Sequence, residues 1–317
     1  MNSIPLIFNE HQIQRVIIGG KTGSVNPKFD ISVILLNETG PQFHTVLLEN
    51  LISCGFKSII SVEPNNENCN IENISKKYPA VKFFVPLEKT TDGELINACV
   101  NEIDSKFFLV LRDSLYIPSG FLLENMAENL VSENLFCLVP RLLSKGGESV
   151  FMHILPDVYK GHFSMEAVSS VSDMSPTVFP FDYIGLYNRE KFISTGGFDY
   201  TISSHYWQLA DLSLRAWLFG EKINITTRFF ITYKKEVPVL EYSFDLSYLR
   251  FYLKNVLPRV KNGCAFISNF SFFTFFRHSS CGFFESLKQF KNAKKWVNSN
   301  QYRFSFDLQG FLESWKI

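Results

Sequence analysis

The sequence has no apolar run as long as the roughly 20 residues that a membrane-spanning helix needs. Its first residues, Met1 to Pro5, also lack the basic segment followed by an apolar run that marks a secretory signal peptide. These two absences argue against an integral membrane protein and against secretion. We therefore expect a cytoplasmic protein.

The chain also lacks an excess of either charge, because 31 Lys and Arg residues balance 31 Asp and Glu residues. Nucleic-acid binders concentrate Lys and Arg to contact phosphates, so this balance argues against a nucleic-acid partner. Paired cysteines are missing too, since the six cysteines form neither a C-x-x-C motif nor a disulfide framework. Scattered cysteines are typical of a reducing compartment.

Apolar residues are plentiful, and short runs of them alternate with helical patterns through the first half of the chain. Of 317 residues, 46% are hydrophobic, which is enough for a large core. The β-branched run at 30–36 is typical of a strand buried on both faces of a parallel sheet. Similar runs follow at 58–62, 81–85, 107–111 and 135–139. This order predicts an α/β fold with a mostly parallel sheet flanked by helices.

Three parts of the chain differ in pattern. Residues 1–29 are a polar N-terminal lead-in, 30–235 carry the strand and helix alternation, and 236–317 are helical and rich in aromatic residues. We predict one α/β domain followed by a helical extension. Ligands of such sheets bind beyond the carboxyl ends of the strands, which are the segments at 37–38, 63–65 and 112–114.

The stretch from 195 to 223 carries the most specific motif. The sequence GGFD at 196–199 allows a sharp turn, and the helix after it places Trp207, Asp211 and Arg215 on one face. This stretch resembles the acceptor-side signature of inverting family 2 glycosyltransferases, in which GGFD precedes a helix of the type E-D-x-D-L-x-x-R. The resemblance extends, as an order of elements, over roughly residues 28–235.

The resemblance implies a GT-A fold and transfer of a sugar, with inversion, from a nucleotide-sugar donor to a glycan, lipid or protein acceptor. It implies that residues near the strand ends bind the nucleotide, namely Asn37, Glu38, Glu63, Asn97, Arg112 and Asp113. It also implies that the acceptor lies beside Gly197, Asp199, Tyr206 and Trp207.

The sequence departs from the family where the D-x-D motif should be. A divalent cation held by carboxylates neutralises the leaving diphosphate in such enzymes. Here the position reads Leu111-Arg112-Asp113-Ser114, with one acid. Two interpretations stay open: Asp113 is a ligand of Mg²⁺ or Mn²⁺, or the Arg112 guanidinium replaces the metal and transfer is metal-independent.

A second departure concerns the catalytic base, which takes the proton of the acceptor hydroxyl. The family's E-D pair reads Gln208-Leu209 here, and neither side chain can accept a proton usefully. The remaining candidates are Asp211, Asp182, His205 and Asp199. The alternative function is a catalytically inactive relative that serves as a binding or assembly subunit.

The Phe-rich segment that begins at residue 266 and the lysines up to residue 295 are a candidate for membrane contact. Asn269 and Arg277 interrupt the segment, so it would lie on a membrane surface and not cross it. Peripheral contact at the inner face of the membrane is one interpretation. The other is a helix packed over the sheet domain. Nothing in the sequence specifies an oligomeric state.

Overall fold

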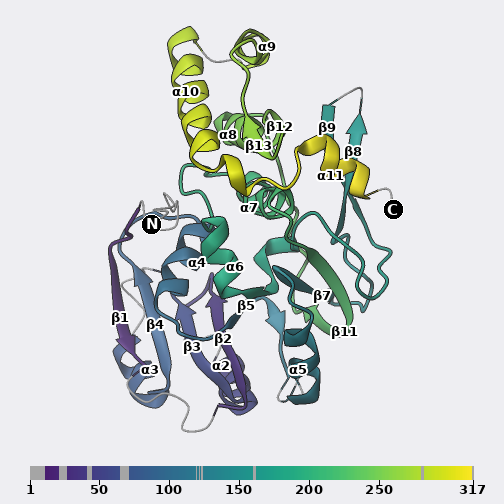
Figure 1. Cartoon of the computed structure of the whole chain (residues 1–317). Helices are drawn as coiled ribbons and strands as arrows, with labels where there is room; N and C mark the ends of the chain where they lie inside the picture. Colours follow the sequence, from purple (N-terminus) through teal and green to yellow (C-terminus); the bar gives the residue numbers. More distant parts are fainter. Residues whose placement is uncertain are drawn as a thin grey trace.

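The computed structural model describes residues 11–315 apart from 21–26, 41–44, 65–70 and the single positions 119, 121, 123, 160, 161, 280 and 281. It contains a central sheet of nine strands in the order β1-β4-β3-β2-β5-β10-β7-β11-β6 (Figure 1). Four neighbouring strands are parallel and coincide with predicted runs: β2 (Phe29–Leu36), β3 (Phe56–Val62), β4 (Val81–Pro86) and β5 (Phe107–Arg112). Their side chains are almost all buried, as expected for a sheet covered on both faces.

The second half of the sheet is mixed. Strand β10 (Gly185–Asn188) runs antiparallel between β5 and β7 (Cys137–Leu143). Strand β11 (Ile223–Tyr233) is parallel to β7, and the short β6 (Leu115–Tyr116) pairs antiparallel with its end. The pairing of β11 with β7 is irregular between Thr226 and Phe230.

The predicted N-terminal lead-in contributes to the sheet. Its apolar piece lies in β1 (Arg15–Gly19), which pairs antiparallel with β4 at the sheet edge. Residues 1–10 and 21–26 of the lead-in lie outside the described part of the chain. Between residues 144 and 180, β8 (His153–Tyr159) and β9 (His162–Val168) form a separate hairpin.

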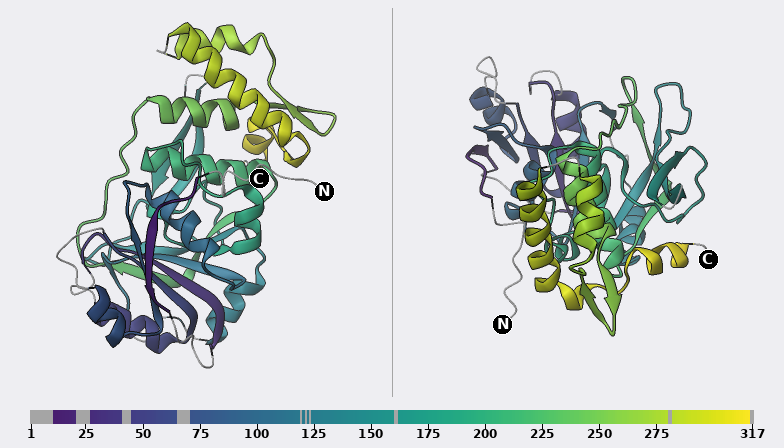
Figure 2. Two further views of the ribbon diagram at one scale, coloured as in Figure 1. Left: turned by 90° about the vertical axis from the view of Figure 1, so that its left-hand side faces the viewer. Right: turned by 90° about the horizontal axis from the view of Figure 1, so that it is seen from above.

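Helices flank the sheet on both faces (Figures 1 and 2). They are α2 (Thr45–Cys54), α3 (Ile71–Lys77), α4 (Asp92–Asn101), α5 (Glu124–Ser132), α6 (Arg189–Thr195) and α7 (His205–Leu218). Thr91 and Glu94 form a capping box at the start of α4, and the Ser204 hydroxyl accepts from the Trp207 amide at the start of α7. Helix α6 ends at Gly196, whose φ of 99° suits glycine.

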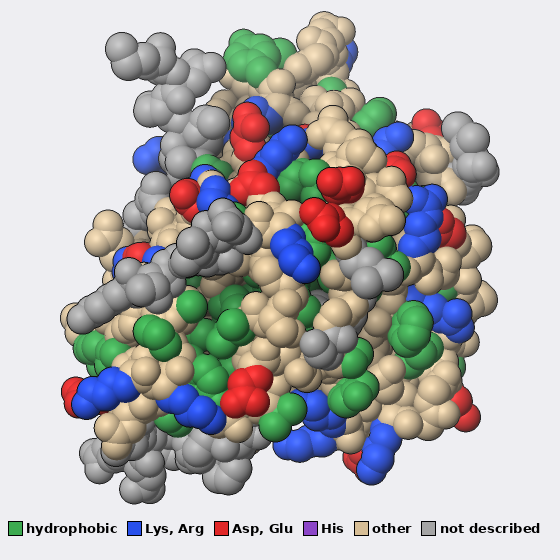
Figure 3. Space-filling view, turned by 90° about the horizontal axis from the view of Figure 1, so that it is seen from below, with side chains coloured by type: hydrophobic (Ala, Val, Ile, Leu, Met, Phe, Trp, Pro, Cys, Tyr) green, Lys and Arg blue, Asp and Glu red, His purple; other side chains and the backbone are tan. Residues whose placement is uncertain are grey.

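The C-terminal extension lies over α7 (Figures 1 and 2). It comprises α8 (Leu246–Phe251), a π-helical turn η3 (Tyr252–Val256), a hairpin of β12 (Arg259–Lys261) and β13 (Cys264–Phe266), α9 (Ser271–His278), α10 (Phe283–Ser299), a short turn η4 (Gln301–Arg303) and α11 (Leu308–Trp315). None of the described helices is long and apolar enough to cross a membrane. On the opposite face of the molecule, acidic and basic side chains are interspersed (Figure 3).

Candidate functional site

Four charged or titratable side chains meet beyond the carboxyl end of β5, and we call them the strand-end cluster: Asp92, Arg112, Asp182 and His205. Arg112 is the last residue of β5 and is only 7% exposed. Its Nη2 donates to Asp92 at 2.5 Å and its Nε lies 2.7 Å from the Asp182 carboxylate. Burial disfavours the guanidinium's charge, but the two acids outweigh burial and raise the pKa of Arg112.

Asp182 sits in a strained turn in front of β10. The turn η2 (Phe181–Tyr183) carries positive φ angles at Asp182 (55°) and Tyr183 (63°), which non-glycine residues seldom adopt. Burial raises the pKa of Asp182 to about 6, although Arg112 opposes the shift. A carboxyl group of this kind changes protonation close to neutral pH, as a group that transfers protons must.

His205 is the first residue of α7, and it lies at the wall of a cavity of about 600 Å³. Its Nε2 is 3.5 Å from the Asp182 carboxylate. Burial, with a smaller contribution from Arg112, lowers the pKa of His205 to about 4, so the imidazole is neutral at pH 7. The same cavity is lined by Lys89, Asp92 and Glu94, so the cluster is open to a ligand.

Helix α7 and the strand ends are held face to face by polar contacts. The Gln208 side chain accepts from the Gly93 amide and the Tyr183 hydroxyl, and it donates to the Thr91 hydroxyl. The approach at Gly93 is so close that a Cβ there would lie 2.4 Å from the Gln208 oxygen. These contacts hold the start of α4 and the turn before β10 against α7.

Asn97 is committed to the GGFD loop. Its amide donates to the Phe198 carbonyl at 2.8 Å and accepts from the Phe198 amide at 2.9 Å. Asn97 is buried, so this residue, expected to bind nucleotide, holds the loop in place in the structure.

Asn37 and Glu63 lie together at the ends of β2 and β3. The Asn37 amide nitrogen donates to Glu63 at 3.1 Å, and the Ser61 hydroxyl donates to the same carboxylate oxygen at 2.6 Å. The Asn37 side-chain oxygen is buried and has no hydrogen-bond partner among the described residues.

Asp113 organises the loop after β2. One carboxylate oxygen accepts from the backbone amides of Glu38 and Thr39 and from the Thr39 hydroxyl at 2.7 Å. The predicted residues Glu38 and Asp113 are therefore neighbours. Glu38 itself is exposed and lies 4.0 Å from Arg112.

The end of β5 offers a divalent cation one carboxylate, that of Asp113. Asp113 already gives one oxygen to the neighbouring loop, and Arg112 occupies a position where the family has an acid. Throughout the described parts of the chain, no three His, Cys, Asp or Glu side chains are grouped closely enough to hold a metal ion. A cation at Asp113 would therefore take its remaining ligands from water and from the bound diphosphate.

A second group of charges, the buried charge network, lies between α7 and the C-terminal extension: Asp199, Asp211, Arg215 and Lys254. Asp211 is fully buried and contacts Arg215 at 2.8 Å and Lys254 at 3.3 Å. Lys254 also contacts Asp199, and Asn255 donates to Asp211 at 2.8 Å. Two acids balance two bases, so the network is electrically neutral.

The network places Asp211 out of reach of solvent. Burial would raise the pKa of Asp199, but Lys254 prevails and lowers it to about 2. The Arg215 guanidinium also donates to the carbonyls of Thr195 and Gly197, which fixes the GGFD turn. The candidate residues Gly197, Asp199 and Asp211 therefore lie in or beside the buried charge network. Asp182 and His205 belong to the strand-end cluster.

Tyr206 and Trp207, expected to contact an acceptor, belong to a buried aromatic group. Trp207 packs against Phe251 and Tyr248 of the extension, and its indole nitrogen donates to the Ser243 carbonyl at 2.7 Å. Tyr206 lines an apolar cavity of about 690 Å³.

Sequence reasoning missed Asp92, Gln208 as a contact residue, Lys254 and Asn255. The acidic residue at the first position of a capped helix was a signal for Asp92, since a helix start favours an acid. No local pattern marked Lys254 or Asn255, because their partners lie more than 40 residues away in sequence.

Comparison with solved structures identifies the architecture. The chain superposes on GalNAc-T7 in a crystal structure with UDP, GalNAc and Mn²⁺, with a TM-score of 0.59, 12% identity and 90% of this chain covered. It superposes on a fragment of S. aureus TarS in complex with UDP-GlcNAc, with a TM-score of 0.52, 12% identity and 85% coverage.

The chain has the GT-A glycosyltransferase fold. It spans 57% of the GalNAc-T7 chain and 72% of the TarS fragment. No protein-family model matches the sequence, and no curated protein matches it either. The fold prediction is confirmed, and at 12% identity the likeness shows the fold alone.

Proposed function

We propose that this GT-A protein transfers a sugar, with inversion, from a nucleotide-sugar donor to an acceptor hydroxyl. The observation that carries the proposal is the strand-end cluster, in which a neutral histidine backed by a carboxylate opens onto a cavity beside α7. The donor nucleotides named in the GalNAc-T7 and TarS structures support a nucleotide-sugar donor.

His205 acts as the general base in this proposal. The imidazole takes the proton of the acceptor hydroxyl while its oxygen attacks the anomeric carbon from the side opposite the nucleotide. The bond between that carbon and the diphosphate breaks, and the diphosphate leaves with the bonding electrons. Asp182 orients the ring and stabilises the imidazolium, as the carboxylate does in other histidine–carboxylate pairs.

The charge count of the strand-end cluster supports this role. With both acids ionised, Asp92 and Asp182 face a single guanidinium, Arg112, so the cluster lacks one positive charge. A proton received by His205 supplies that charge during the reaction. Asp92 favours the protonated ring, whereas the resting pKa of about 4 keeps it free to accept a proton.

The donor would lie along the strand ends. We assign Asn37 and Glu63 to the base, Glu38 and Asp113 to the loop beside the diphosphate, and Asn97 to support of the GGFD loop. Arg112 is paired with Asp92 and Asp182, so Lys89 at the cavity wall supplies the positive charge near the diphosphate in a metal-independent transfer.

Turnover of UDP-, GDP- and dTDP-sugars, with and without Mn²⁺, tests the proposal. Product from at least one donor supports a transferase. Nucleotide binding without turnover of any donor favours the second candidate, a catalytically inactive binding or assembly subunit. The observation in favour of this second candidate is that Gln208, at the family's acidic position, is fully buried in structural hydrogen bonds.

Acceptor contacts would come from the walls around α7. Gly197 and Asp199 belong to the GGFD loop, and Tyr206 lines the apolar cavity of about 690 Å³. The acceptor hydroxyl itself would reach His205 through the 600 Å³ cavity.

We also propose peripheral contact with the inner face of a membrane through the α9–α10 end of a cytoplasmic protein. Phe270 and Phe284 are each 85% exposed, and Phe273 is exposed beside them. Aromatic residues next to lysines are typical of segments that lie in the lipid interface. Flotation with anionic vesicles tests this, because Phe270→Ser with Phe284→Ser should abolish binding, and unchanged flotation would refute the contact.

A further inference from the structure

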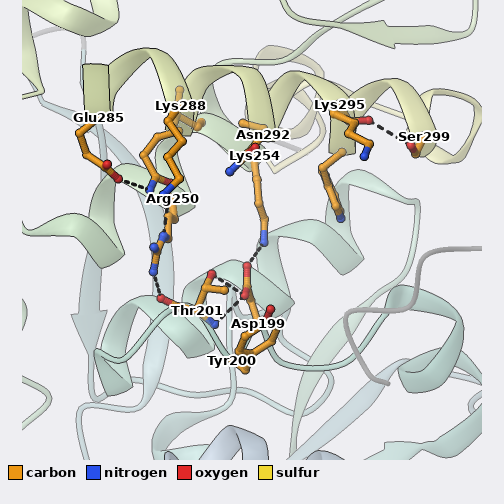
Figure 4. Close-up of a pocket in the computed structure, with 14 residues that line it drawn as sticks. Asp199, Tyr200, Thr201, Arg250, Lys254, Glu285, Lys288, Asn292, Lys295 and Ser299 are labelled. Atoms are coloured by element: carbon orange, nitrogen blue, oxygen red, sulfur yellow. Dashed lines mark hydrogen bonds and ion pairs between the residues drawn. The ribbon is translucent and has the colours of Figure 1, made fainter. Parts of the chain in front are cut away.

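A second cavity, of about 450 Å³, lies between α10 and the GGFD loop, apart from the strand-end cluster (Figure 4). Its roof is one face of α10, where residues spaced by three or four positions point down into it: Glu285, Lys288, Asn292, Lys295 and Ser299. Its floor is formed by Asp199, Tyr200 and Thr201, and its side by Arg250 and Lys254.

The lining carries an excess of positive charge. Four bases, Arg250, Lys254, Lys288 and Lys295, face two acids, Asp199 and Glu285. The chain as a whole is neutral, and yet α10 alone carries four lysines and one glutamate. This local excess attracts an anion.

Part of this charge is uncommitted. Lys254 is paired with Asp199, and Arg250 donates to the Thr201 carbonyl and to Gln289. Among the described residues, by contrast, the amines of Lys288 and Lys295 form no salt bridge with an acid. Lys288 and Lys295 lie on the same face of α10, about 10 Å apart along its axis, so their long side chains can approach one anion in the cavity from its two ends.

The cavity adjoins the strand-end cluster. Tyr200 lines both cavities, and the segment 199–205 runs from Asp199 in one to His205 in the other. A molecule whose anionic group lies under α10 can therefore extend past Tyr200 and bring a hydroxyl to His205.

We propose that this cavity, the α10 pocket, binds a phosphate group of the acceptor, so that the acceptor is a phosphate ester. The inference rests on the proposed transfer reaction and specifies its substrate class. The phosphate can belong to a soluble ester or to a lipid headgroup, since both present the same tetrahedral anion.

Titration of the full chain with glycerol phosphate, followed by calorimetry at low salt, tests the pocket. Lys288→Gln with Lys295→Gln should weaken binding about tenfold or more, because two charge-assisted contacts are lost. Lys291→Gln with Lys294→Gln is the matched control, since it removes the same two charges from α10 outside the pocket lining, and it should leave affinity within about twofold. Equal affinity in all three proteins, or no binding to wild type, overturns the proposal.

Vesicles containing phosphatidic acid separate the two sources. Binding that free glycerol phosphate displaces and that the double variant loses assigns a lipid-borne phosphate. Binding of the soluble ester alone assigns a soluble acceptor. UDP affinity measured in the same proteins separates the pocket proposal from the transferase proposal. The affinity for UDP should be unchanged in the double variant. A wild-type protein that binds glycerol phosphate but no nucleotide would refute the transferase proposal and leave the pocket proposal intact.

Discussion

The strand-end cluster and the buried charge network use the same kinds of side chain in opposite ways. The network sets two acids against two bases, holds Asp211 at 0% exposure and borders the α10 pocket through Asp199 and Lys254. The cluster sets two acids against one guanidinium and reaches a cavity through His205. Removing one member of a balanced buried network destabilises the fold, whereas unbalanced charges beside a cavity are suited to proton transfer.

The residues of the motif are not the residues beside the cavity at His205. Asp199, Asp211 and Arg215 give the resemblance its specificity, and all three lie in the buried charge network. Lys254 brings the extension into that network from the π-helical turn η3, a feature often found where backbone geometry serves a specific contact. The C-terminal extension is thus bound to α7 by ion pairs as well as by packing.

The largest effect should come from breaking the network at Lys254. Lys254→Met leaves the two acids without their shared base, so we expect a loss of about 3–5 kcal/mol in the free energy of unfolding. Urea denaturation measures this, with the exposed Lys291→Met as the control, expected within about 0.5 kcal/mol of wild type. A change in the free energy of unfolding as small as the control's would show that the buried charge network does not stabilise the fold.

The next effect should be on turnover, with stability nearly unchanged. His205→Gln removes the proton acceptor while keeping a polar side chain, so we expect kcat to fall by about 10²-fold or more. Thermal unfolding of the variant serves as the control for folding. Full turnover in His205→Gln would show that another residue is the base, and that the strand-end cluster is not the site of proton transfer.

A pH series sharpens the comparison because the two regions titrate differently. Asp182, with a pKa of about 6, must be ionised to support His205, so kcat/KM should fall by up to tenfold per pH unit below pH 6. Asp199 has a lowered pKa of about 2, so its stabilising contribution is complete above its unfolded pKa of about 3.9 and is lost as pH falls towards 2. Activity should therefore be lost at a higher pH than structure, as rate and circular dichroism would show. Coincident losses would contradict the assignment.

The smallest effects should come from Asp113 and from metal removal. Asp113→Ala releases the 38–39 loop and should weaken UDP binding several-fold, by loss of hydrogen bonds worth about 1 kcal/mol each. EDTA should leave turnover unchanged, because Lys89 supplies the positive charge that a metal would otherwise provide. Activity that requires Mn²⁺ would refute that substitution.

Much of the fold follows from local pattern. The buried runs at 30–36 and 107–111 are β-branched or aromatic on both faces, and this fixed the parallel half of the sheet. The antiparallel β10 and the edge strand β1 could not be found this way, because a short apolar segment does not specify its partner or direction. The helical nature of the extension was predicted, whereas its salt bridges to α7 were not.

The candidate site was predicted less completely. His205, Asp182 and Arg112 were chosen from sequence, and the structure places them in one cluster. Their grouping depends on the strained turn at Asp182, whose positive φ no residue type signals. Asp211 was chosen for its motif position, and its burial depends on residues from the extension that periodicity does not reveal.

A crystal structure of the protein with bound UDP tests the central contrast most directly. We expect the diphosphate to lie in the cavity lined by Lys89, Asp92 and His205, and the uracil to lie near Glu63. The ion pairs of the buried charge network should be unchanged. UDP found only in the α10 pocket, or bound to Asp211 after the network has opened, would contradict this expectation.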